Sequence, residues 1–242
     1  MTIDLLIPFH GKLHLLAQCL QPLLKTTISK GLTIHLIDDG SPEQVDKLPD
    51  HATSIVINRI HLKEKVGFVG AVNFAWSQCK NDIVIVLNND TIPGPNLIKN
   101  LAAVLENDPE IAAVGPVSDN PRDLFQFREQ APDHRVNYLQ HSFTDYLTAA
   151  CMAIRRAAIK EEWLFDPRYS PGYFEDLDLC CKLRHRGWKL SILESEYIHH
   201  EGSATFGSEP DLAGLLQKNY SRFSSSWSHM PGHYELDQLL WI

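Results

Sequence analysis

NDIVIVLNND, residues 81–90, contains a short apolar run that ends on a cluster of amide and acidic side chains. The run at 83–87 is apolar at every position and rich in β-branched residues, which predicts a strand buried on both faces of a sheet. Asn88, Asn89 and Asp90 follow it directly. Because ligands of parallel α/β sheets collect at the carboxyl ends of the strands, this cluster marks a candidate site.

Short apolar runs alternate with helical patterns around this strand. Strands are expected at 4–8, 33–37 and 54–57, and apolar residues at helical spacing cover 13–24 and 68–79. This β-α-β alternation predicts an α/β fold with a mostly parallel, Rossmann-like central sheet flanked by helices.

The pattern weakens beyond Gly115. Residues 116–145 are polar and lack periodicity, which predicts a long loop that is either a linker or functional. The elements expected after it are a strand entering a helix at 147–156, a helix over 175–186, strands near Leu190 and Tyr197, and a last helix over 211–227. We expect one domain over 1–242, with a nucleotide-sugar-binding half at 1–115 and an acceptor or catalytic half at 116–242.

Bulk properties narrow the class of protein. With 242 residues the chain is long enough for one sizeable domain. The net charge of −8, without a basic run, excludes non-specific nucleic-acid binding through phosphates. The five cysteines form no C-x-x-C pair, which indicates free thiols in a reducing compartment. Neither a signal peptide nor an apolar run of the ~20 residues that span a bilayer is visible, so we expect a cytoplasmic protein, with peripheral attachment to the inner membrane face left open.

Two further polar clusters follow predicted strands. Asp38 and Asp39 come directly after the strand at 33–37, and Pro8 ends the first strand. A capped turn would explain an Asp-Asp-Gly-Ser sequence without any ligand. However, a carboxylate at the end of a buried strand must be solvated, paired or bound to a metal, and a second such cluster at 88–90 favours a site.

The sharpest local signal is GYFEDLD at 172–178, which places Glu175, Asp176 and Asp178 in or just before the first turn of a helix. Acidic residues there gain ~0.3–1 kcal/mol each from the helix dipole, which accounts for one or two acids but not for three at one corner. A carboxylate in this position can stay ionised and act as a general base for an alcohol.

His199 and His200 follow the last predicted strand. They are either two surface imidazoles or metal ligands. Carboxylates combined with imidazole suit manganese or magnesium, whereas no cysteine has the spacing of a zinc finger.

Taken together, these segments resemble the family-two glycosyltransferases, which have the GT-A fold, and are nearest in style to bacterial enzymes of O-antigen or capsule synthesis. The segments that carry the resemblance, in the family's order, are DLLIPFHGKLHLLAQCLQPLL, IHLIDDGSPEQ, VGFVGAVNFAWSQCKNDIVIVLNNDTIPGPNLI, LTAACMAIRRAAI, FDPRYSPGYFEDLDLCCKLRHRGWKLSILESEYIHHEGSATF and LLQKNYSRFSSSWS.

The resemblance implies an inverting transferase in which Asp176, within a Glu175–Asp176 motif, removes the proton of the acceptor hydroxyl. Binding of the nucleotide-sugar is implied for Pro8, Asp38, Asp39, Gly67, Asn73, Asn88, Asn89 and Asp90. The cluster at 88–90 stands where the family has a D-x-D metal motif, with Asn88 in place of the first acid. Mn²⁺ or Mg²⁺ would be held by Asp90 and by His199 or His200, and the H-x-G-S spacing favours His200.

The implied partners are a UDP-, dTDP- or GDP-linked sugar donor and a glycan, lipid-linked or protein-linked acceptor. A nucleotidyltransferase is the first alternative, although the stretch after the first strand lacks the glycine-rich phosphate loop of that class. A non-catalytic nucleotide- or glycan-binding protein is the second. Residues 202–208, rich in glycine and hydroxyl side chains, are expected to order over the diphosphate when donor and metal bind.

Overall fold

A single sheet organises the residues that the computed structural model describes, which are 2–25, 31–42, 55–130, 139–202 and 210–230. Within these residues the sheet has nine strands in the order β3-β2-β1-β4-β8-β6-β9-β5, and β7 pairs with β9 outside this path. The expected α/β fold is confirmed. Most of the strands share one direction, and β5, β7 and β8 run against it.

The first four strands of the chain are parallel neighbours in the sheet. They are β1 (Ile3–Phe9), β2 (Leu32–Asp38), β3 (Val56–His61) and β4 (Ile83–Leu87). Every residue of β4 is buried, as its composition predicts. The third strand lies further along the chain than the expected 54–57, and most of its residues are exposed because it is the edge of the sheet.

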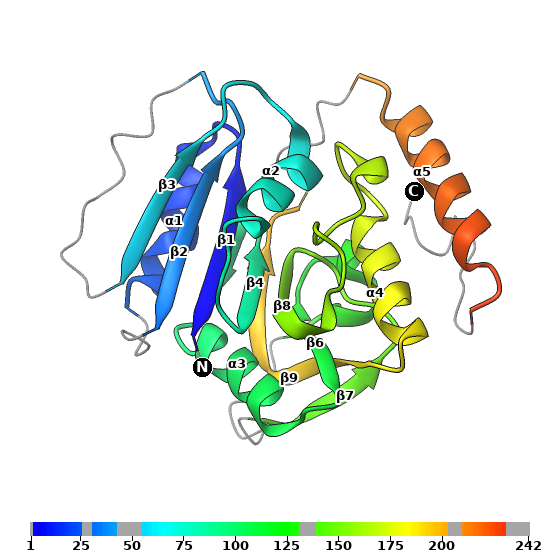
Figure 1. The fold of residues 1–242 in the computed structure, drawn as a ribbon. Helices are drawn as coiled ribbons and strands as arrows, with labels where there is room; N and C mark the ends of the chain where they lie inside the picture. The colour runs from blue at the N-terminus through cyan, green and yellow to red at the C-terminus, as the bar shows by residue number, and fades with distance from the viewer. Residues whose placement is uncertain (1, 26–30, 43–54, 131–138, 203–209, 231–242) are drawn as a thin grey trace.

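Helices cover both faces of the sheet (Figure 1). α1 (Leu13–Leu23) and α3 (Leu97–Asn107) pack on one face, and α2 (Gly67–Trp76) and α4 (Glu175–His185) pack on the other. α5 (Leu212–Trp227) lies outside α4. The predictions for α1, α4 and α5 are confirmed to within a residue, whereas α2 ends at Trp76 instead of 79 and α3 was not predicted.

The elements after β4 differ more from the expectation. The strands there are β5 (Thr91–Pro93), β6 (Ile111–Ser118), β7 (His141–Thr144), β8 (Cys151–Arg155) and β9 (Lys189–His200). The two strands expected near Leu190 and Tyr197 are one strand, β9, which shifts its register against β6 between these positions. The strand expected within 147–156 is β8, and a short 3-10 turn follows it at Arg156–Ala158.

The prediction of a bare loop over 116–145 is wrong. This stretch begins inside β6, continues through a 3-10 helix at Pro121–Gln126 and ends with β7, while 131–138 lie outside the described residues. The expected boundary between two halves at 115/116 falls within β6, so the same sheet crosses it. The assignment of a binding half and an acceptor half stays a prediction.

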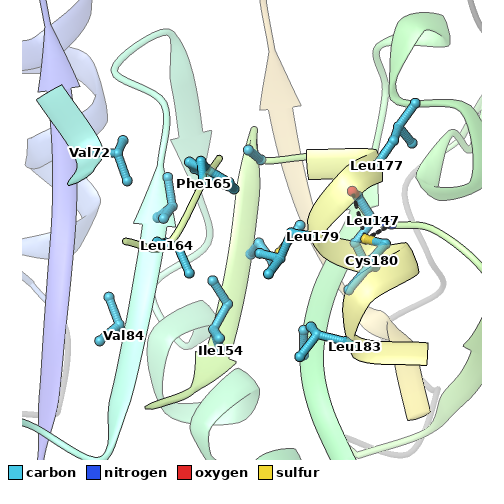
Figure 2. Close-up of a cluster of buried hydrophobic side chains, with 14 of the residues drawn as sticks. Val72, Val84, Leu147, Ile154, Leu164, Phe165, Leu177, Leu179, Cys180 and Leu183 are labelled. Carbon is cyan, nitrogen blue, oxygen red and sulfur yellow. Dashed lines mark hydrogen bonds between the residues drawn. The ribbon is translucent and has the colours of Figure 1, made fainter. Parts of the chain in front are cut away.

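Two apolar cores hold the layers together, one on each face of the sheet. Figure 2 shows part of the core beneath α2 and α4, where Val84 and Ile154 of the sheet face Leu179 and Leu183 of α4. Cys180 of α4 exchanges hydrogen bonds with the backbone of Leu147, which ties the segment before β8 to this helix. All five cysteines are buried and free, as expected. Among the described residues no helix is long and apolar enough to cross a membrane.

Candidate active site

The carboxyl ends of β1, β2 and β4 meet at one edge of the sheet, because these strands are parallel neighbours. Asp38 ends β2 and is buried. Its carboxylate accepts hydrogen bonds from the backbone N–H of Ser41 at 2.9 Å and bonds the ring of His61 at 2.8 Å. Pro8 lies beside it in β1, opposite Ile37. Asp38 therefore stabilises the turn at 38–41, which is the capped turn that the sequence analysis left open as an alternative to a ligand site.

Asp39 joins this turn to the start of α2. Its two carboxylate oxygens accept the backbone N–H groups of Val66 at 2.7 Å and Gly67 at 2.9 Å, where an acid also complements the helix dipole. Gly67 has φ +82°, and a Cβ there would overlap Pro171. Only glycine permits this approach of α2 to the segment around 171. Roles of Asp38, Asp39 and Gly67 in nucleotide binding stay predictions.

Asn73 supports the backbone beside α2. Its Oδ1 accepts the N–H groups of Leu164 at 3.0 Å and Phe165 at 2.9 Å, and its Nδ2 donates to the Phe165 carbonyl at 2.7 Å. The carboxamide thus uses both ends within the protein. These contacts give Asn73 a structural task, while the role implied by the resemblance stays a prediction.

The cluster at 88–90 lies at the end of β4, near the middle of the sheet. Asn89 and Asp90 are buried. The buried Oδ1 of Asn88 has no hydrogen-bond donor among the described residues, although such an acceptor ordinarily has one. A cation or a ligand hydroxyl group at this position would satisfy it.

The pairing of β5 with β9 brings His200 next to Asp90. Thr91 lies opposite His200 and Ile92 opposite His199 in this antiparallel ladder. Since side chains alternate along a strand, the two histidines point in opposite directions. His199 is exposed and bonds to Asp119. The largely buried ring of His200 instead places Nε2 3.5 Å from Oδ1 of Asp90.

Asp123 is a site residue that the sequence analysis missed. It is buried and bonds Nδ1 of His200 at 2.8 Å, while Ser118 donates its hydroxyl to the same carboxylate. Burial alone would lower the pKa of His200, but the hydrogen bonds and charges of Asp123 and Asp90 raise it to about 10. Asp123 lies in the stretch without periodicity, so nothing in the sequence pairs it with His200.

The donor set of this cluster fits a divalent ion of the magnesium or manganese type, which prefers carboxylate, carbonyl and imidazole ligands. Two ligands on neighbouring positions of an octahedral ion, each at about 2.1 Å, lie about 3 Å apart. The 3.5 Å between Asp90 and His200 is close to that separation, and the acceptor of Asn88 stands at the same strand end.

Asp4, His35 and Cys79 form a second cluster with ligand-type atoms. It lies at the opposite end of β1, because Asp4 is near the first residue of that strand. Asp4 bonds His35 at 2.8 Å and accepts the N–H groups of Lys80 and Asn81, which gives it a structural role at the end of α2. Burial raises the pKa of the Cys79 thiol to about 12, which opposes the thiolate that a metal needs.

Glu175 and Asp176 occupy the start of α4, as the sequence predicts. The Asp176 carboxylate accepts the N–H groups of Ala149 at 3.0 Å and of Leu177 at 2.8 Å. Glu175 is buried, and its Oε2 has no hydrogen-bond donor among the described residues. Asp178, the third acid, forms an ion pair with Lys182 at 2.6 Å and belongs to the framework of the helix.

Burial raises the pKa of both acids at this corner. For Asp176, the backbone N–H groups of Ala149 and Leu177 oppose this effect, while the negative charge of Asp123 adds to it. For Glu175 burial is joined by the charges of Asp176 and Asp178, so its pKa lies well above the ordinary value. A carboxylate with a pKa closer to neutrality is a stronger base than an ordinary aspartate, as general-base catalysis requires.

Solved structures resemble the fold closely. PcManGT, a mannosyltransferase from Pyrobaculum calidifontis in complex with GDP-Man and Mn²⁺, has a TM-score of 0.71 at 16% identity, over 92% of this chain and 64% of its own. GalNAc-T7 with UDP, GalNAc and Mn²⁺ has a TM-score of 0.70 at 18% identity, over 95% of this chain and 48% of its own. TarS 1-349 of S. aureus with UDP-GlcNAc has a TM-score of 0.65 at 14% identity, over 93% and 67% of the two chains. These similarities identify the GT-A type of fold.

Similar sequences of known function come from Mycobacterium tuberculosis. A pre-mycofactocin glycosyltransferase is 27% identical over 187 residues, which is 72% of this chain and 38% of the relative. An N-acetylglucosaminyl-diphospho-decaprenol L-rhamnosyltransferase is 28% identical over 156 residues, which is 54% of this chain and 50% of the relative. The matched region thus spans half or less of these relatives.

The family model for "Glycosyl transferase family 2" matches residues 4–164, from the start of β1 to the segment that Asn73 holds. This region contains the strand-end cluster at 88–90 and Asp123, while Asp176 and His200 follow it along the chain. Since more than half of the chain is matched, the protein belongs to glycosyl transferase family 2.

Proposed function

We propose that the protein is an inverting glycosyltransferase that moves a sugar from a nucleoside-diphosphate sugar onto an acceptor hydroxyl, with Asp176 as general base. Membership of family 2 supports sugar transfer over the nucleotidyltransferase alternative. The observation that carries the assignment of residues is a continuous set of contacts between the end of β4 and the start of α4. It runs from Asp90 through His200 and Asp123 to Thr148, whose neighbour Ala149 bonds Asp176.

Asp176 is suited to take a proton from the attacking hydroxyl. Its carboxylate is oriented by two backbone N–H groups, and burial raises its pKa towards neutrality. Burial also raises the pKa of the neighbouring Glu175, and the negative charges of Asp176 and Asp178 add to this effect. In an inverting displacement the acceptor oxygen attacks the anomeric carbon while the diphosphate leaves from the opposite face.

The diphosphate side of the donor is assigned to the end of β4. Asp90 and His200 would hold Mn²⁺ or Mg²⁺, which would neutralise the charge that develops on the departing diphosphate. Asn88, Asn89 and Pro8 stand at the same edge of the sheet, beside the turn that Asp38 and Asp39 stabilise. His200 is preferred over His199 because its ring faces Asp90, whereas the ring of His199 is exposed.

The donor and acceptor are proposed by class. Structural neighbours hold GDP-mannose or UDP-N-acetylglucosamine, which supports a UDP-, GDP- or dTDP-linked sugar. One relative is named for a lipid-linked acceptor, N-acetylglucosaminyl-diphospho-decaprenol, which supports a role in bacterial glycoconjugate or surface-polysaccharide synthesis.

The test begins with a calorimetric screen of nucleoside diphosphates, with Mn²⁺ and with EDTA, followed by transfer assays with the matching donor sugar. Asp176→Asn keeps the shape of the side chain but cannot accept a proton. We expect kcat to fall by ~10²–10⁴-fold while nucleotide affinity stays near that of the wild type. Activity within threefold of the wild type would refute Asp176 as the base. A wild type that binds nucleotide but neither hydrolyses nor transfers any donor would support the non-catalytic alternative.

A further inference from the structure

The segment that leads into Asp176 has an unusual backbone. Tyr173 has φ +73° and Phe174 has φ +72°, and both are consecutive non-glycine residues in the left-handed region. This conformation costs free energy for a residue with a Cβ, and two in a row persist only where the surroundings impose them. Phe174 is followed at once by Glu175 and Asp176, so the direction in which α4 begins depends on this strained turn.

Asn219 of α5 holds this turn through hydrogen bonds to the loop that precedes it. Its Nδ2 lies 3.1 Å from the carbonyl oxygen of Tyr169, 2.9 Å from that of Gly172 and 3.1 Å from that of Tyr173. The side chain is completely buried, with 0% of its surface exposed. Two N–H bonds are therefore shared among three carbonyl groups of one loop. A buried carbonyl group without a hydrogen-bond donor lowers the stability of the folded state. The conformation of this loop therefore depends on the Asn219 carboxamide.

Other residues of α5 reinforce the same contact. Phe174 packs against Tyr220, with ring centroids 5.9 Å apart, and against Phe223 at 5.7 Å. Trp227 donates its indole N–H to Asp178 at 2.8 Å, in the first turn of α4. Figure 1 shows α5 along the outer side of α4, away from the strands that carry the 88–90 cluster. The helix thus contacts the chain on both sides of Asp176.

We propose that Asn219 is a positioning residue for Asp176, and that α5 orients the general base of the reaction through it. This inference rests on the proposed function of Asp176. The carboxamide fixes the loop at 169–173, the loop fixes the left-handed turn at Tyr173 and Phe174, and the turn sets where the Asp176 carboxylate meets the acceptor. The residues assigned to the diphosphate and metal, Asn88, Asp90 and His200, lie at strand ends, whereas Gly67 of α2 packs against Pro171 of the 169–173 loop. We therefore expect Asn219 to act on sugar transfer more than on metal-dependent nucleotide binding.

The test replaces Asn219 by Asp, which keeps the size of the side chain but removes both N–H donors. We expect kcat for transfer, expressed per nucleotide-binding site counted by calorimetry, to fall by about 10- to 100-fold, because small displacements of a catalytic group are sufficient for such losses. Nucleotide affinity with Mn²⁺ and the KM for the donor should change less than threefold. Hydrogen exchange of the peptides covering 169–178 should become faster, and that of 83–93 should stay unchanged. Asn219→Ser, which keeps one hydroxyl donor, should lie between the wild type and Asn219→Asp, and it replaces the latter if that variant does not fold.

Ser221→Ala is the matched control, because Ser221 is exposed on the same helix and bonds only within it. A kcat per binding site within threefold of the wild type in Asn219→Asp would overturn the proposal. The proposal would also be overturned if the total activity of Asn219→Asp fell only in proportion to the fraction of protein that binds nucleotide. That outcome would show a general defect in folding. Asp176→Asn is measured in parallel. If that variant remains active, the proposed function has failed, whereas an inactive Asp176→Asn beside a fully active Asn219→Asp refutes only the role of Asn219.

Discussion

His200 carries a carboxylate near each nitrogen of its ring, Asp123 at Nδ1 and Asp90 at Nε2. Asp123 is held in turn by the hydroxyl of Ser118. A histidine that binds a metal through one nitrogen almost always donates the other N–H to such a partner, which fixes the tautomer and orients the ring. Asp123 would therefore direct the lone pair of Nε2 towards Asp90. With a pKa of about 10, the metal-free ring of His200 carries a proton on both nitrogens at neutral pH. An ion bound at Nε2 would displace the proton of that nitrogen.

Asp123→Asn is expected to weaken Mn²⁺ binding by about 10- to 100-fold, because the amide can present its N–H to Nδ1 and thereby favour the wrong tautomer. Calorimetry with Mn²⁺, in the presence of the bound nucleoside diphosphate, measures the change directly. His199→Ala should leave Mn²⁺ affinity within threefold, since its ring is exposed and faces Asp119. Asp82→Asn removes the same charge from an exposed position at the far end of β4 and controls for electrostatics. Equal weakening in His199→Ala and Asp123→Asn would contradict the assignment of His200.

The contact between α2 and the segment around Pro171 depends on a missing side chain. Gly67 is the first residue of α2, and a Cβ there would overlap the Cβ of Pro171 and stand 2.9 Å from its carbonyl oxygen. The same helix start also donates the N–H of Val69 to this carbonyl. Because the 169–173 loop lies between α2 and α5, this approach joins the turn held by Asp39 to the corner of Asp176.

Gly67→Ala should lower the free energy of unfolding by about 2–4 kcal/mol, of which about 1–2 kcal/mol reflects the left-handed backbone and the remainder the overlap with Pro171. Urea unfolding at constant m-value measures the difference. Gly187→Ala separates the two causes, since Gly187 has φ +84° but no atom within 4 Å of an added Cβ. Equal losses in the two variants would show that the loop around Pro171 yields to the extra methyl group without cost.

At the scale of elements, the sequence predicts what depends on local periodicity. The run at 83–87 became β4 without a change of bounds, and the acidic helix start at 175 became α4. α3 was not predicted, although its buried residues have helical spacing. β6 was missed for a physical reason. It contains Gly115 and Pro116, its register shifts after Pro116, and an added Cβ at Gly115 would lie 2.5 Å from Gln126.

For the site, the sequence predicts the residues that lie at strand and helix ends. Asp38, Asp90 and Asp176 all occupy such ends. Contacts between segments that are distant in the sequence are not predicted by it. Asp123 and His200 are 77 residues apart, and Asn219 lies 47 residues from Gly172. A single Asp in a polar stretch or a single Asn on an amphipathic helix has no local signature, since only the packing of the sheet and of α5 brings each to its partner.

For the molecule as a whole, acidic groups with shifted pKa values fall into two sets. The pKa is lowered for Asp4, Asp119, Glu161 and Asp166. Burial alone would raise the pKa of these groups, but hydrogen bonds to the carboxylate and nearby positive charges lower it. It is raised by burial for Glu175, Asp176 and Glu196. Groups of the first set stabilise the fold above their ordinary pKa and lose this contribution as the pH falls. Groups of the second set stabilise it less as the pH rises, because the buried side chains must ionise. Ionisation is thus opposed at Glu175 and Asp176, in the proposed catalytic corner, and also at Glu196, which bonds Asn100 of α3.

Part of the loss of stability at acid pH can be assigned to Asp166. Burial alone would raise the pKa of Asp166, but the hydrogen bonds of Arg168 and the charges of Lys182 and Arg168 lower it from 3.8 to about 2. The folded state therefore gains stability from this carboxylate above about pH 4 and loses it as the pH falls towards 2. Because Arg168 is largely exposed and screened by solvent, we expect Asp166→Asn to cost about 1–2 kcal/mol at pH 7. The difference from the wild type in the free energy of unfolding, measured with urea, should shrink steadily between pH 5 and pH 2, since protonation abolishes the same interaction.

Asp145→Asn is the control. It removes a carboxylate from the half-exposed pair with Arg184 and should cost less than about 0.5–1 kcal/mol. A difference for Asp166→Asn that stays constant down to pH 2 would mean that the side chain acts through its shape or its cap on Arg168 N–H, and that its charge does not contribute.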